Sequence, residues 1–315
     1  MIVTTDITTP RTEPTAVALG LFDGLHLGHR AVISAMTQAA AQQALRPTVF
    51  TFLPYGTIPH GKAGLTLLQT EQQKQRLLST LGVAETVAPP FEAFMKLSPS
   101  AFVKTLLRDT LHAKVLVCGD NYRFGKAASA GVDELRVLAA PLGIQVITAP
   151  PVLLDGAMVS SSRIRKAIVD GQPELAEAML GAPFTIEGTV VRGKQLGRTL
   201  HSPTVNLALP TAFTQPLHGV YLTRVQTTGG SYWGVTNIGT RPTVDGQGVN
   251  CETYLMNFTG ELYGQEIAVA FQRLLRVERR FPDTAALANQ IQLDIKKACE
   301  WIPKLCRQEN ENDGQ

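Results

Sequence analysis

The order of predicted elements changes at Gly181-Ala182-Pro183, and this change constrains the fold of the chain most strongly. Before this point, short apolar runs alternate with stretches whose apolar residues recur at helical spacing. Such alternation predicts a parallel sheet covered by helices, because parallel strands need a crossover connection. After this point, strand-like runs follow one another with turn residues between them, which predicts an antiparallel sandwich or barrel. We therefore expect domains at 1–182 and 183–307 and a flexible tail at 308–315.

The first domain is predicted to begin with a βαβ unit. An apolar run at 16–21 precedes Val32, Met36 and Ala39, which fall at helical spacing, and a second strand follows at 48–52. Thr70 with Gln73 forms a capping box, and Ser98 before Pro99 is a second helix start. The remaining predictions for this domain are helices at 132–138 and 161–180 and strands at 114–118 and 144–148.

The second domain is predicted from strand-like runs separated by glycine-rich turns. They lie at 184–192, 219–226, 232–237, 251–258 and 266–274. A closing helix should begin near Asp283 and place Leu287, Ile291 and Ile295 on the face that packs against the barrel.

Composition narrows the classes of function. The formal net charge is +3, and no run of lysine and arginine marks a nucleic-acid-binding stripe. The four cysteines form no C-x-x-C pair and are expected to be reduced core thiols. No basic region followed by an apolar stretch opens the chain, and prolines interrupt its most apolar region, 139–159. We expect a cytoplasmic protein with small-molecule substrates, without nucleic-acid or membrane partners, and the sequence does not predict a homo-oligomer.

The loop GLFDGLHLGH joins the first strand to its helix, at the sheet edge where α/β proteins bind ligands. Its glycines allow close backbone approach, and the helix that follows directs free N–H groups at an anion. His26 and His29 lie three apart and can both face that anion. Two alternatives are hydrogen-bonded structural histidines and a zinc site, but the metalloprotease pattern spaces its histidines four apart around a glutamate.

Two further segments carry chemistry in the first domain. GDNYRFG, at 119–125, follows a predicted strand end, and VSSSRIR, at 159–165, lies at a helix start. Ser161 and Ser162 can cap the helix and donate to phosphate, while Arg163 and Arg165 supply charge. The alternative for VSSSRIR is an ordinary helix cap beside a solvated arginine.

In the second domain, GTVVRGKQLGRTLHSPTVN, at 188–206, combines glycines with basic residues and can wrap phosphates. It is not a Walker loop, because GK[ST] is absent. Thr204 and Asn206 add uncharged oxygens suited to a magnesium ion that carries ATP phosphates.

These motifs resemble those of a known family. G-x-F-D-G-x-H-x-G-H is similar to the adenylyltransferase module of bacterial bifunctional riboflavin kinase and FAD synthetase, within the H-x-G-H nucleotidyltransferases. The segment 188–206 resembles the riboflavin kinase signature, and GVY, NIGTRPT, LYG and LLRVERRF extend the likeness over nearly the whole chain. The resemblance implies a Rossmann-like α/β nucleotidyltransferase domain, then an all-β antiparallel barrel with a C-terminal helix. It also implies phosphorylation of riboflavin to FMN and adenylylation of FMN to FAD, with Mg²⁺, ATP, riboflavin, FMN and FAD as cofactor, substrates and products.

The resemblance implies a role for each matching residue. Glu252 would be the general base of the kinase, and His26 and His29 would bind the triphosphate during adenylyl transfer. Phe124 and Arg276 would lie near the flavin, and Thr204 and Asn206 would hold the metal. The residues expected to bind nucleotide are Gly20, Phe22, Asp23, Gly24, Gly28, Asn121, Ser161, Ser162, Arg163, Arg165, Gly193, Lys194, Gly197 and Arg198.

The chain departs from the family pattern at a few positions. TFLPYG places Tyr55 and Gly56 where the family has histidine and proline, and His201 and Ser202 replace a glycine and an aromatic residue. Three other functions therefore stay open: an enzyme with one activity only, a flavin or nucleotide sensor with decayed sites, and, for the first half alone, transfer of a nucleotidyl group to a non-flavin acceptor. The intact Glu252 argues against the sensor, because a pure binder needs no base.

Overall fold

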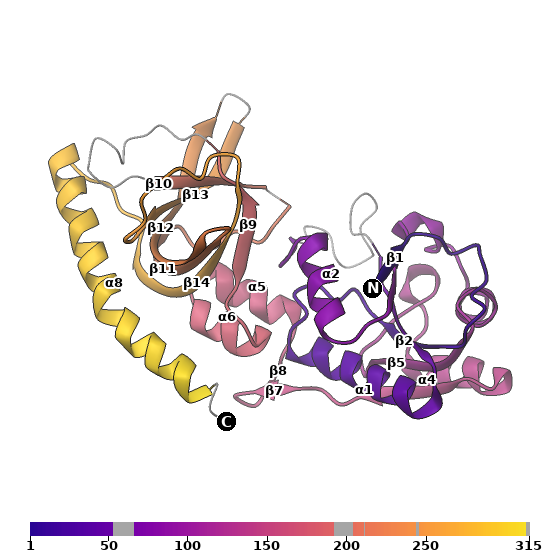
Figure 1. Ribbon diagram of the computed structural model, residues 1–315. Helices are drawn as coiled ribbons and strands as arrows, with labels where there is room; N and C mark the ends of the chain where they lie inside the picture. Colours follow the sequence, from indigo (N-terminus) through magenta and orange to yellow (C-terminus); the bar gives the residue numbers. More distant parts are fainter. Residues whose placement is uncertain (53–65, 192–203, 211, 244–245, 313–315) are drawn as a thin grey trace. The chain divides into compact units, whose positions relative to one another are not determined.

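A computed structural model describes residues 1–52, 66–191, 204–210, 212–243 and 246–312 (Figure 1). The chain divides into two compact units, Met1–Ser161 and Ser162–Gln315. This division falls at the start of a helix, so the helical segment before Gly181 groups with the second unit, and the domain boundary expected at 182 stays a prediction. In the described residues, no helix offers the long apolar stretch that crossing a membrane requires.

The first unit is built on a six-stranded sheet whose neighbouring strands are all parallel. The strand order is β1-β4-β3-β2-β5-β6. The strands are β1 (Ile2–Thr4), β2 (Thr15–Leu19), β3 (Arg46–Phe50), β4 (Glu85–Val87), β5 (Ala113–Gly119) and β6 (Gln145–Ala149), and a small hairpin follows with β7 (Leu153–Leu154) and β8 (Ala157–Met158). The predicted parallel sheet is confirmed.

Helices cover both faces of this sheet, since the central strand β2 is buried on each side. Val17 and Leu19 belong to one hydrophobic cluster, and Ala16 and Ala18 belong to the other. The helices of this unit are α1 (Leu27–Gln43), α2 (Glu71–Thr80), η1 (Phe91–Ala93), α3 (Pro99–Ala101), η2 (Phe102–Thr110), η3 (Lys126–Ala128), α4 (Val132–Ala139) and η4 (Ala140–Leu142). Val32, Met36 and Ala39 are buried, and Thr70 and Gln73 form the predicted capping box.

The sequence did not predict every element correctly. β1 and β4 are missing from the predictions, because three-residue strands are too short to show a hydrophobic period. The helix expected to begin at Ser98 is present, but its longer part, η2, is a π-helix and not an α-helix. Its wider turn brings Phe102, Leu106 and Leu111 into one buried cluster.

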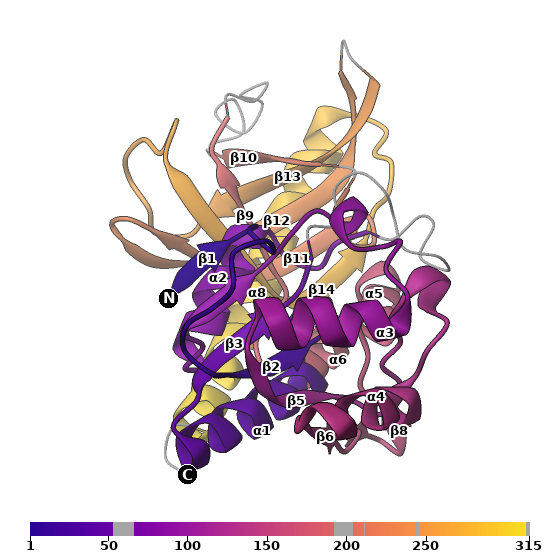
Figure 2. The ribbon, with the colours of Figure 1, turned by 90° about the vertical axis from the view of Figure 1, so that its right-hand side faces the viewer.

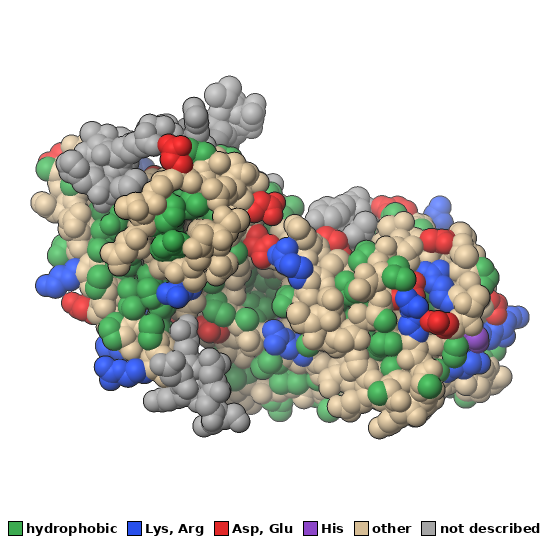
Figure 3. Space-filling model, viewed as in Figure 1, with side chains coloured by type: hydrophobic (Ala, Val, Ile, Leu, Met, Phe, Trp, Pro, Cys, Tyr) green, Lys and Arg blue, Asp and Glu red, His purple; other side chains and the backbone are tan. Residues whose placement is uncertain are grey.

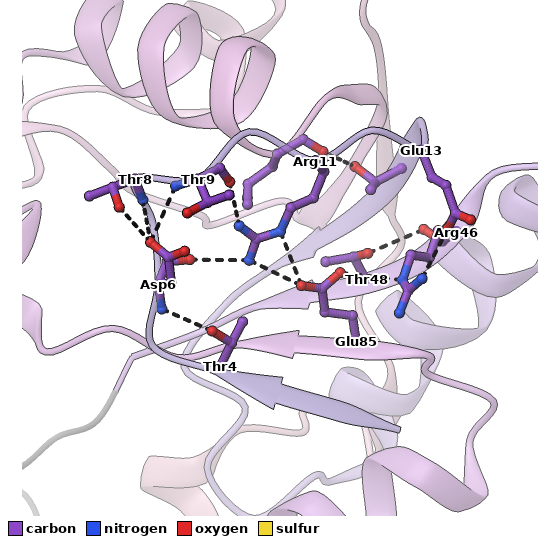
Figure 4. Close-up of polar contacts among 11 residues, drawn as sticks. Thr4, Asp6, Thr8, Thr9, Arg11, Glu13, Arg46, Thr48 and Glu85 are labelled. Atoms are coloured by element: carbon purple, nitrogen blue, oxygen red, sulfur yellow. Dashed lines mark hydrogen bonds and ion pairs between the residues drawn. The ribbon is translucent and has the colours of Figure 1, made fainter.

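An ion network ties strands β3 and β4 to the segment between β1 and β2 (Figure 4). Glu85, on β4, is 6% exposed and lies between Arg11, at 3.0 Å, and Arg46, at 3.3 Å. Glu13, whose side chain is 65% exposed, also contacts Arg46, at 2.9 Å. Asp6 accepts hydrogen bonds from Thr8 and Thr9, which lower the pKa of its carboxyl group.

The second unit contains a six-stranded antiparallel sheet in the order β10-β13-β12-β11-β14-β9. Val191, just beyond β9, bridges to Asn206 on β10, which nearly closes the sheet into a barrel. The strands are β9 (Thr185–Thr189), β10 (Thr204–Leu209), β11 (Gly219–Thr227), β12 (Gly230–Thr243), β13 (Gly246–Leu255) and β14 (Glu266–Val277). The predicted barrel is confirmed, and Figure 2 shows β12 and β13 extending together as a long hairpin.

In the described part of this unit, the helices are α5 (Ser161–Val169), α6 (Pro173–Leu180) and α8 (Thr284–Asn312). α8 runs along the outside of the barrel (Figure 1), where Ala298 and Ile295 pack against Val220, Leu222 and Leu275. Ile295 therefore lies on the expected face, and Leu287, Ile291 and Ile295 are all half-buried. The helix continues to Asn312 and so includes part of the segment 308–315 that was expected to be a tail.

The expectation that all four cysteines lie in a core is wrong for two of them. Cys118 and Cys251 are buried on strands, and burial raises their thiol pKa values to about 11 and about 12. Cys299 is exposed and Cys306 is half-buried, because both lie on α8, which is covered by the barrel along only one face. All four are free thiols.

We predict that Glu85→Gln lowers the free energy of unfolding of the first unit by about 3 kcal/mol, because it leaves two enclosed arginines without their shared carboxylate. Urea denaturation of the full chain, followed by hydrogen exchange in peptides of the first unit, measures the effect. Glu13→Gln is the matched control: it removes an exposed partner of the same Arg46 and should cost less than about 1 kcal/mol. Equal losses in the two variants would contradict the assignment.

Candidate functional sites in the two units

The first candidate site lies where the strand order of the parallel sheet reverses. β2 starts the series that runs through β3 to β4 on one side, and β5 starts the series toward β6 on the other. The loops after β2 and β5 must therefore diverge to opposite faces, which opens a crevice at the carboxyl ends of these strands. The loop GLFDGLHLGH follows β2, and GDNYRFG begins at the end of β5.

The loop after β2 has an unusual backbone. Phe22 and Leu25 have φ values of 54° and 40°, and Gly24 has a φ of 86°. Left-handed conformations at non-glycine residues cost of order 1–3 kcal/mol each and tend to occur at functional sites. The side chains of Phe22 and Leu25 pack into the core below the loop, and this burial offsets the cost.

Four hydrogen bonds from other segments hold the same loop. Thr51 donates to the carbonyl of Leu21 at 2.9 Å, and Gln69 donates to the carbonyl of Phe22 at 3.0 Å. Asp23 is buried: its carboxylate accepts from the N–H of Leu68 at 3.0 Å, and its carbonyl accepts from Ser161 at 2.9 Å. The loop is thus preorganised by contacts from three other segments of the chain.

The two histidines lie together at the start of α1. Their rings stack with centroids 3.6 Å apart, and His26 is the N-cap residue, whose Nδ1 accepts from the backbone N–H of His29 at 3.3 Å. A neutral His26 therefore carries its proton on Nε2, where it can donate to an anion. Gly28 leaves room for the stack, because a Cβ there would lie 3.2 Å from Cε1 of His26 and would press on that ring.

A cavity of about 630 Å³ opens beside this crevice, at the ends of β5 and β6 and the start of α4. Asn121, expected to bind nucleotide, lines it together with Tyr122, Arg123, Asp133 and Arg136. Burial raises the pKa of Tyr122, so its phenol stays protonated at neutral pH. A mixture of a ring, two cations and carboxylates suits a polar heterocyclic ligand.

Phe124, expected near the flavin, belongs to the hydrophobic core below this cavity. It is buried, and its ring stacks on Tyr122 with centroids 5.9 Å apart. Among the other predicted residues, Ser161 begins α5, and Ser162, Arg163 and Arg165 follow on that helix in the second unit. Roles for these residues stay predictions.

The second candidate site lies on the outer face of the barrel. β10 pairs Asn206 with Glu252 on β13, so these two side chains point to the same face. Thr204, two residues before Asn206, shares that face because side chains alternate along a strand. The register thus brings together the predicted metal ligands and the predicted base, which are far apart in sequence.

Two hydrogen bonds fix this cluster. Thr204 Oγ1 donates to Glu252 Oε1 at 2.6 Å, and Asn250 Nδ2 donates to Asn206 Oδ1 at 2.9 Å. Asn206 is 2% exposed, whereas Glu252 is half-buried and remains accessible. Within the described residues, Oε2 of Glu252 makes no hydrogen bond, so it can accept a proton from a ligand.

The donor atoms in this cluster suit a hard cation. A hydroxyl, an amide carbonyl and a carboxylate are oxygen ligands of the kind that Mg²⁺ prefers. No group of three or more His, Cys, Asp or Glu residues with metal-binding geometry occurs in the part of the chain that the structure describes. The oxygen donors of Thr204, Asn206 and Glu252 fit a hard cation that also binds phosphate oxygens.

Arg276, the other predicted flavin residue, lies on β14 and is held by α8. Its Nε and Nη2 contact the carboxylate of Asp294 at 3.0 and 2.9 Å, and Gln290 donates to the same carboxylate at 2.7 Å.

Sequence reasoning missed Asn250 and Asp294. Asn250 lies two residues before Glu252 on the same strand, so its side chain is on the same face as the predicted base. Asp294 lies one residue before Ile295, and a carboxylate at the predicted packing face of the helix is a signal that could have identified it.

Some predicted residues lie outside the described part of the chain. They are Gly193, Lys194, Gly197 and Arg198 of the basic loop, together with the departures at Tyr55, Gly56, His201 and Ser202. Thr204 and Asn206, which follow the basic loop, lie on strand β10 (Thr204–Leu209). On the face drawn in Figure 3, basic and acidic side chains are interspersed.

Comparisons with known proteins cover both units. Residues 8–163 match the FAD synthetase family, and residues 180–302 match the riboflavin kinase family. The bifunctional riboflavin kinase/FMN adenylyltransferase of Pseudomonas fluorescens is 35% identical over 92% of this chain and 93% of its own length, and that of Escherichia coli K12 is 34% identical over the same shares. A crystal structure from Streptococcus pneumoniae, described as a macrolide-efflux protein, superposes with a TM-score of 0.84 at 29% identity and covers 95% of this chain and 99% of that one. Since relatives with both domains align along nearly the full length, the chain belongs to the bifunctional riboflavin kinase/FMN adenylyltransferase family.

Proposed function

We propose that this chain phosphorylates riboflavin to FMN at the outer face of the barrel and adenylylates FMN to FAD at the crevice of the parallel sheet. The observation that carries the proposal is the 2.6 Å contact between Thr204 and Glu252, beside Asn206 on the paired strand. A carboxylate next to uncharged oxygen ligands is what transfer of phosphate from a nucleotide to an alcohol needs. Membership of the family supports both reactions.

In the kinase reaction, Glu252 acts as the general base. Its Oε2 takes the proton of the ribityl 5′ hydroxyl as that oxygen attacks the γ-phosphorus of ATP, and the bond to the departing ADP oxygen breaks. Thr204 donates to Oε1 and thereby fixes the orientation of the carboxylate. Asn250 likewise fixes the orientation of the Asn206 amide, because its Nδ2 donates to Asn206 Oδ1.

Thr204 and Asn206 would hold Mg²⁺, with Glu252 beside it. When bound, the ion would neutralise charge on the ATP phosphates and orient them. The requirement for Mg²⁺ is therefore part of the proposal, supported by the oxygen donor set.

In the adenylyltransferase reaction, an FMN phosphate oxygen attacks the α-phosphorus of ATP, and pyrophosphate leaves. The residues need to form no covalent intermediate, so their task is positioning and charge stabilisation. His26 donates from Nε2, and the N–H groups at the start of α1 add the positive end of the helix dipole. Phe22 and Leu25 have left-handed backbone conformations, and the contacts of Asp23 stabilise the loop in this shape. In this conformation, the loop backbone can face the phosphates.

We place the protein in the cytoplasm, where ATP and riboflavin are available. The proposed domain limits are 1–182 for adenylyl transfer and 183–307 for the kinase. Small molecules are its proposed partners, and nucleic acid is not among them.

The direct test incubates purified protein with riboflavin, ATP and Mg²⁺ and separates the flavins by chromatography. We expect FMN to form first and FAD to follow. Separate incubations with riboflavin and with FMN assign each reaction, and omission of Mg²⁺ tests the ion. Folded protein that yields neither product would refute the proposed function, and one product alone would support the single-activity alternative.

Glu252→Gln should lower the rate of FMN formation by about 10²- to 10⁴-fold, because the amide cannot accept the hydroxyl proton. FAD formation from added FMN should stay within about twofold of the original rate. Glu266→Gln, which alters an exposed carboxylate on β14, is the control and should change neither rate. Parallel loss of both activities in folded Glu252→Gln would count against two separate sites.

His29→Ala should have the reverse effect. It removes a stacking partner of His26 and a donor near the phosphates, so we expect FAD formation to fall about 10²-fold or more. FMN formation from riboflavin in the same preparation serves as the internal control and should be unchanged. Retention of FAD synthesis would exclude His29 from the phosphate site.

A further inference from the structure

Phe22, in the loop after β2, has a backbone that is fixed on both sides. Its φ of 54° lies in the left-handed region, which non-glycine residues adopt only when surrounding contacts hold them there. Thr51 donates to the carbonyl of Leu21 at 2.9 Å, and Gln69 donates to the carbonyl of Phe22 at 3.0 Å. Because each peptide unit is planar, these two bonds fix both peptide planes that flank Phe22. Rotation of either plane toward a relaxed conformation would break a hydrogen bond.

The ring of Phe22 connects this fixed backbone to the histidine pair. A Cβ at Gly20 would lie 3.1 Å from Cζ of the ring, so the ring lies directly over that glycine. The same ring contacts His29 edge-on, with centroids 5.3 Å apart and an interplanar angle of 71°. His29 in turn stacks on His26 with centroids 3.6 Å apart. A continuous chain of contacts therefore joins the Gln69 amide to both imidazoles.

Gln69 is enclosed although its side chain is polar. It is 8% exposed and lies directly before Thr70, the N-cap residue of α2. Burial of an amide is costly unless its polar atoms are hydrogen-bonded, and Nε2 of Gln69 bonds to the carbonyl of Phe22. The N–H of Leu68 donates to the carboxylate of Asp23 at 3.0 Å, so the segment before α2 holds two consecutive residues of the loop. An apolar side chain of similar volume would fill the same space but would leave the Phe22 carbonyl without this donor.

We propose that Gln69 is a positioning residue of the adenylyltransferase site, which holds Phe22 in its left-handed conformation and thereby keeps His29 stacked on His26. The inference rests on the proposed adenylyltransferase function of the first unit. Electrostatic stabilisation of a transition state requires donors that are already in place, because their reorientation during the reaction costs free energy. Without the Gln69 donor, the backbone of Phe22 relaxes, its ring moves relative to His29, and the imidazoles lose the geometry in which they meet the triphosphate. Gln69 acts through Phe22 and not on the substrate.

The first test measures steady-state formation of FAD from FMN and ATP by the full chain with Gln69→Leu. We expect kcat to fall about tenfold, because the donors to the transition state are displaced but not removed. The KM values for FMN and ATP should stay within about threefold. FMN formation from riboflavin should be unchanged, and Gln72→Leu, the same change at an exposed position of α2, should alter neither reaction. An unchanged kcat for FAD formation in folded Gln69→Leu would overturn the proposal.

The imidazole signals in nuclear magnetic resonance spectra give a readout that a loss of stability alone would not change. The chain has six histidines, and the signals of His26 and His29 are assigned by their absence from His26→Ala and His29→Ala. We expect Gln69→Leu to shift the ring signals of His29 in the ligand-free protein, because the magnetic effect of the Phe22 ring depends on its position. The signals of His112, which lies just before β5 in the same unit, should stay in place. Unshifted His29 signals would contradict the proposal.

A double-variant cycle tests whether Gln69 acts through the ring of Phe22. Phe22→Leu keeps an apolar side chain in the core but removes the ring beside His29. In this background, Gln69→Leu should lower kcat for FAD formation by no more than about twofold. Fully multiplicative effects of the two changes would show that Gln69 acts by another route, and the proposal would fail.

Two further measurements keep the outcome decisive. If Gln69→Leu does not fold, Gln69→Asn replaces it, because its amide is one methylene shorter and cannot reach the Phe22 carbonyl from the same backbone position. A kcat for FAD formation lowered at least about threefold in Gln69→Asn supports the proposal, and an unchanged kcat overturns it. If the wild-type protein forms no FAD, the proposed function fails by itself. The imidazole spectra then still test Gln69, because shifted His29 signals support the positioning role and unshifted signals overturn it.

Discussion

Hydrogen-bonded register between strands decides which side chains meet in both halves of this protein. In the barrel, pairing of β10 with β13 sets Asn206 opposite Glu252, and a shift by one residue would turn one of these two side chains to the interior. The interior is already filled by Cys251, Thr253 and Leu207, which are buried, so this register is strongly specified. In the parallel sheet, pairing of β2 with β3 and β5 aligns the carboxyl ends from which the site loops emerge.

Both candidate sites would have to stabilise the charge of nucleotide phosphates, but they would do so with different chemical groups. The crevice of the first unit relies on backbone N–H groups, a helix start and stacked imidazoles, which suit a phosphate chain that must be bound and held in line. The barrel offers side-chain oxygens from neighbouring strands, which suit a cation and a proton transfer. Each site is preorganised by contacts that involve no ligand: Leu68, Gln69 and Ser161 in the first, Thr204 and Asn250 in the second.

α8 connects packing and chemistry in the second unit. Its apolar face buries Val220 and Leu275 of the barrel, while Asp294 on the same side reaches Arg276. Movement of the helix would therefore change both the hydrophobic contact and the direction of the guanidinium.

The sequence by itself determined the division into an α/β part and a β part, most of the strands and helices, and the motifs that contain His26, His29 and Glu252. These features depend on local periodicity, turn residues and short spacing, which are readable along the chain. It could not reveal β1 and β4, because such short strands gain their stability from neighbours rather than from their own pattern. Only the tertiary structure decided that Thr204 meets Glu252, that Asn250 supports Asn206 and that Asp294 holds Arg276, since these contacts depend on strand register and on where a distant helix packs.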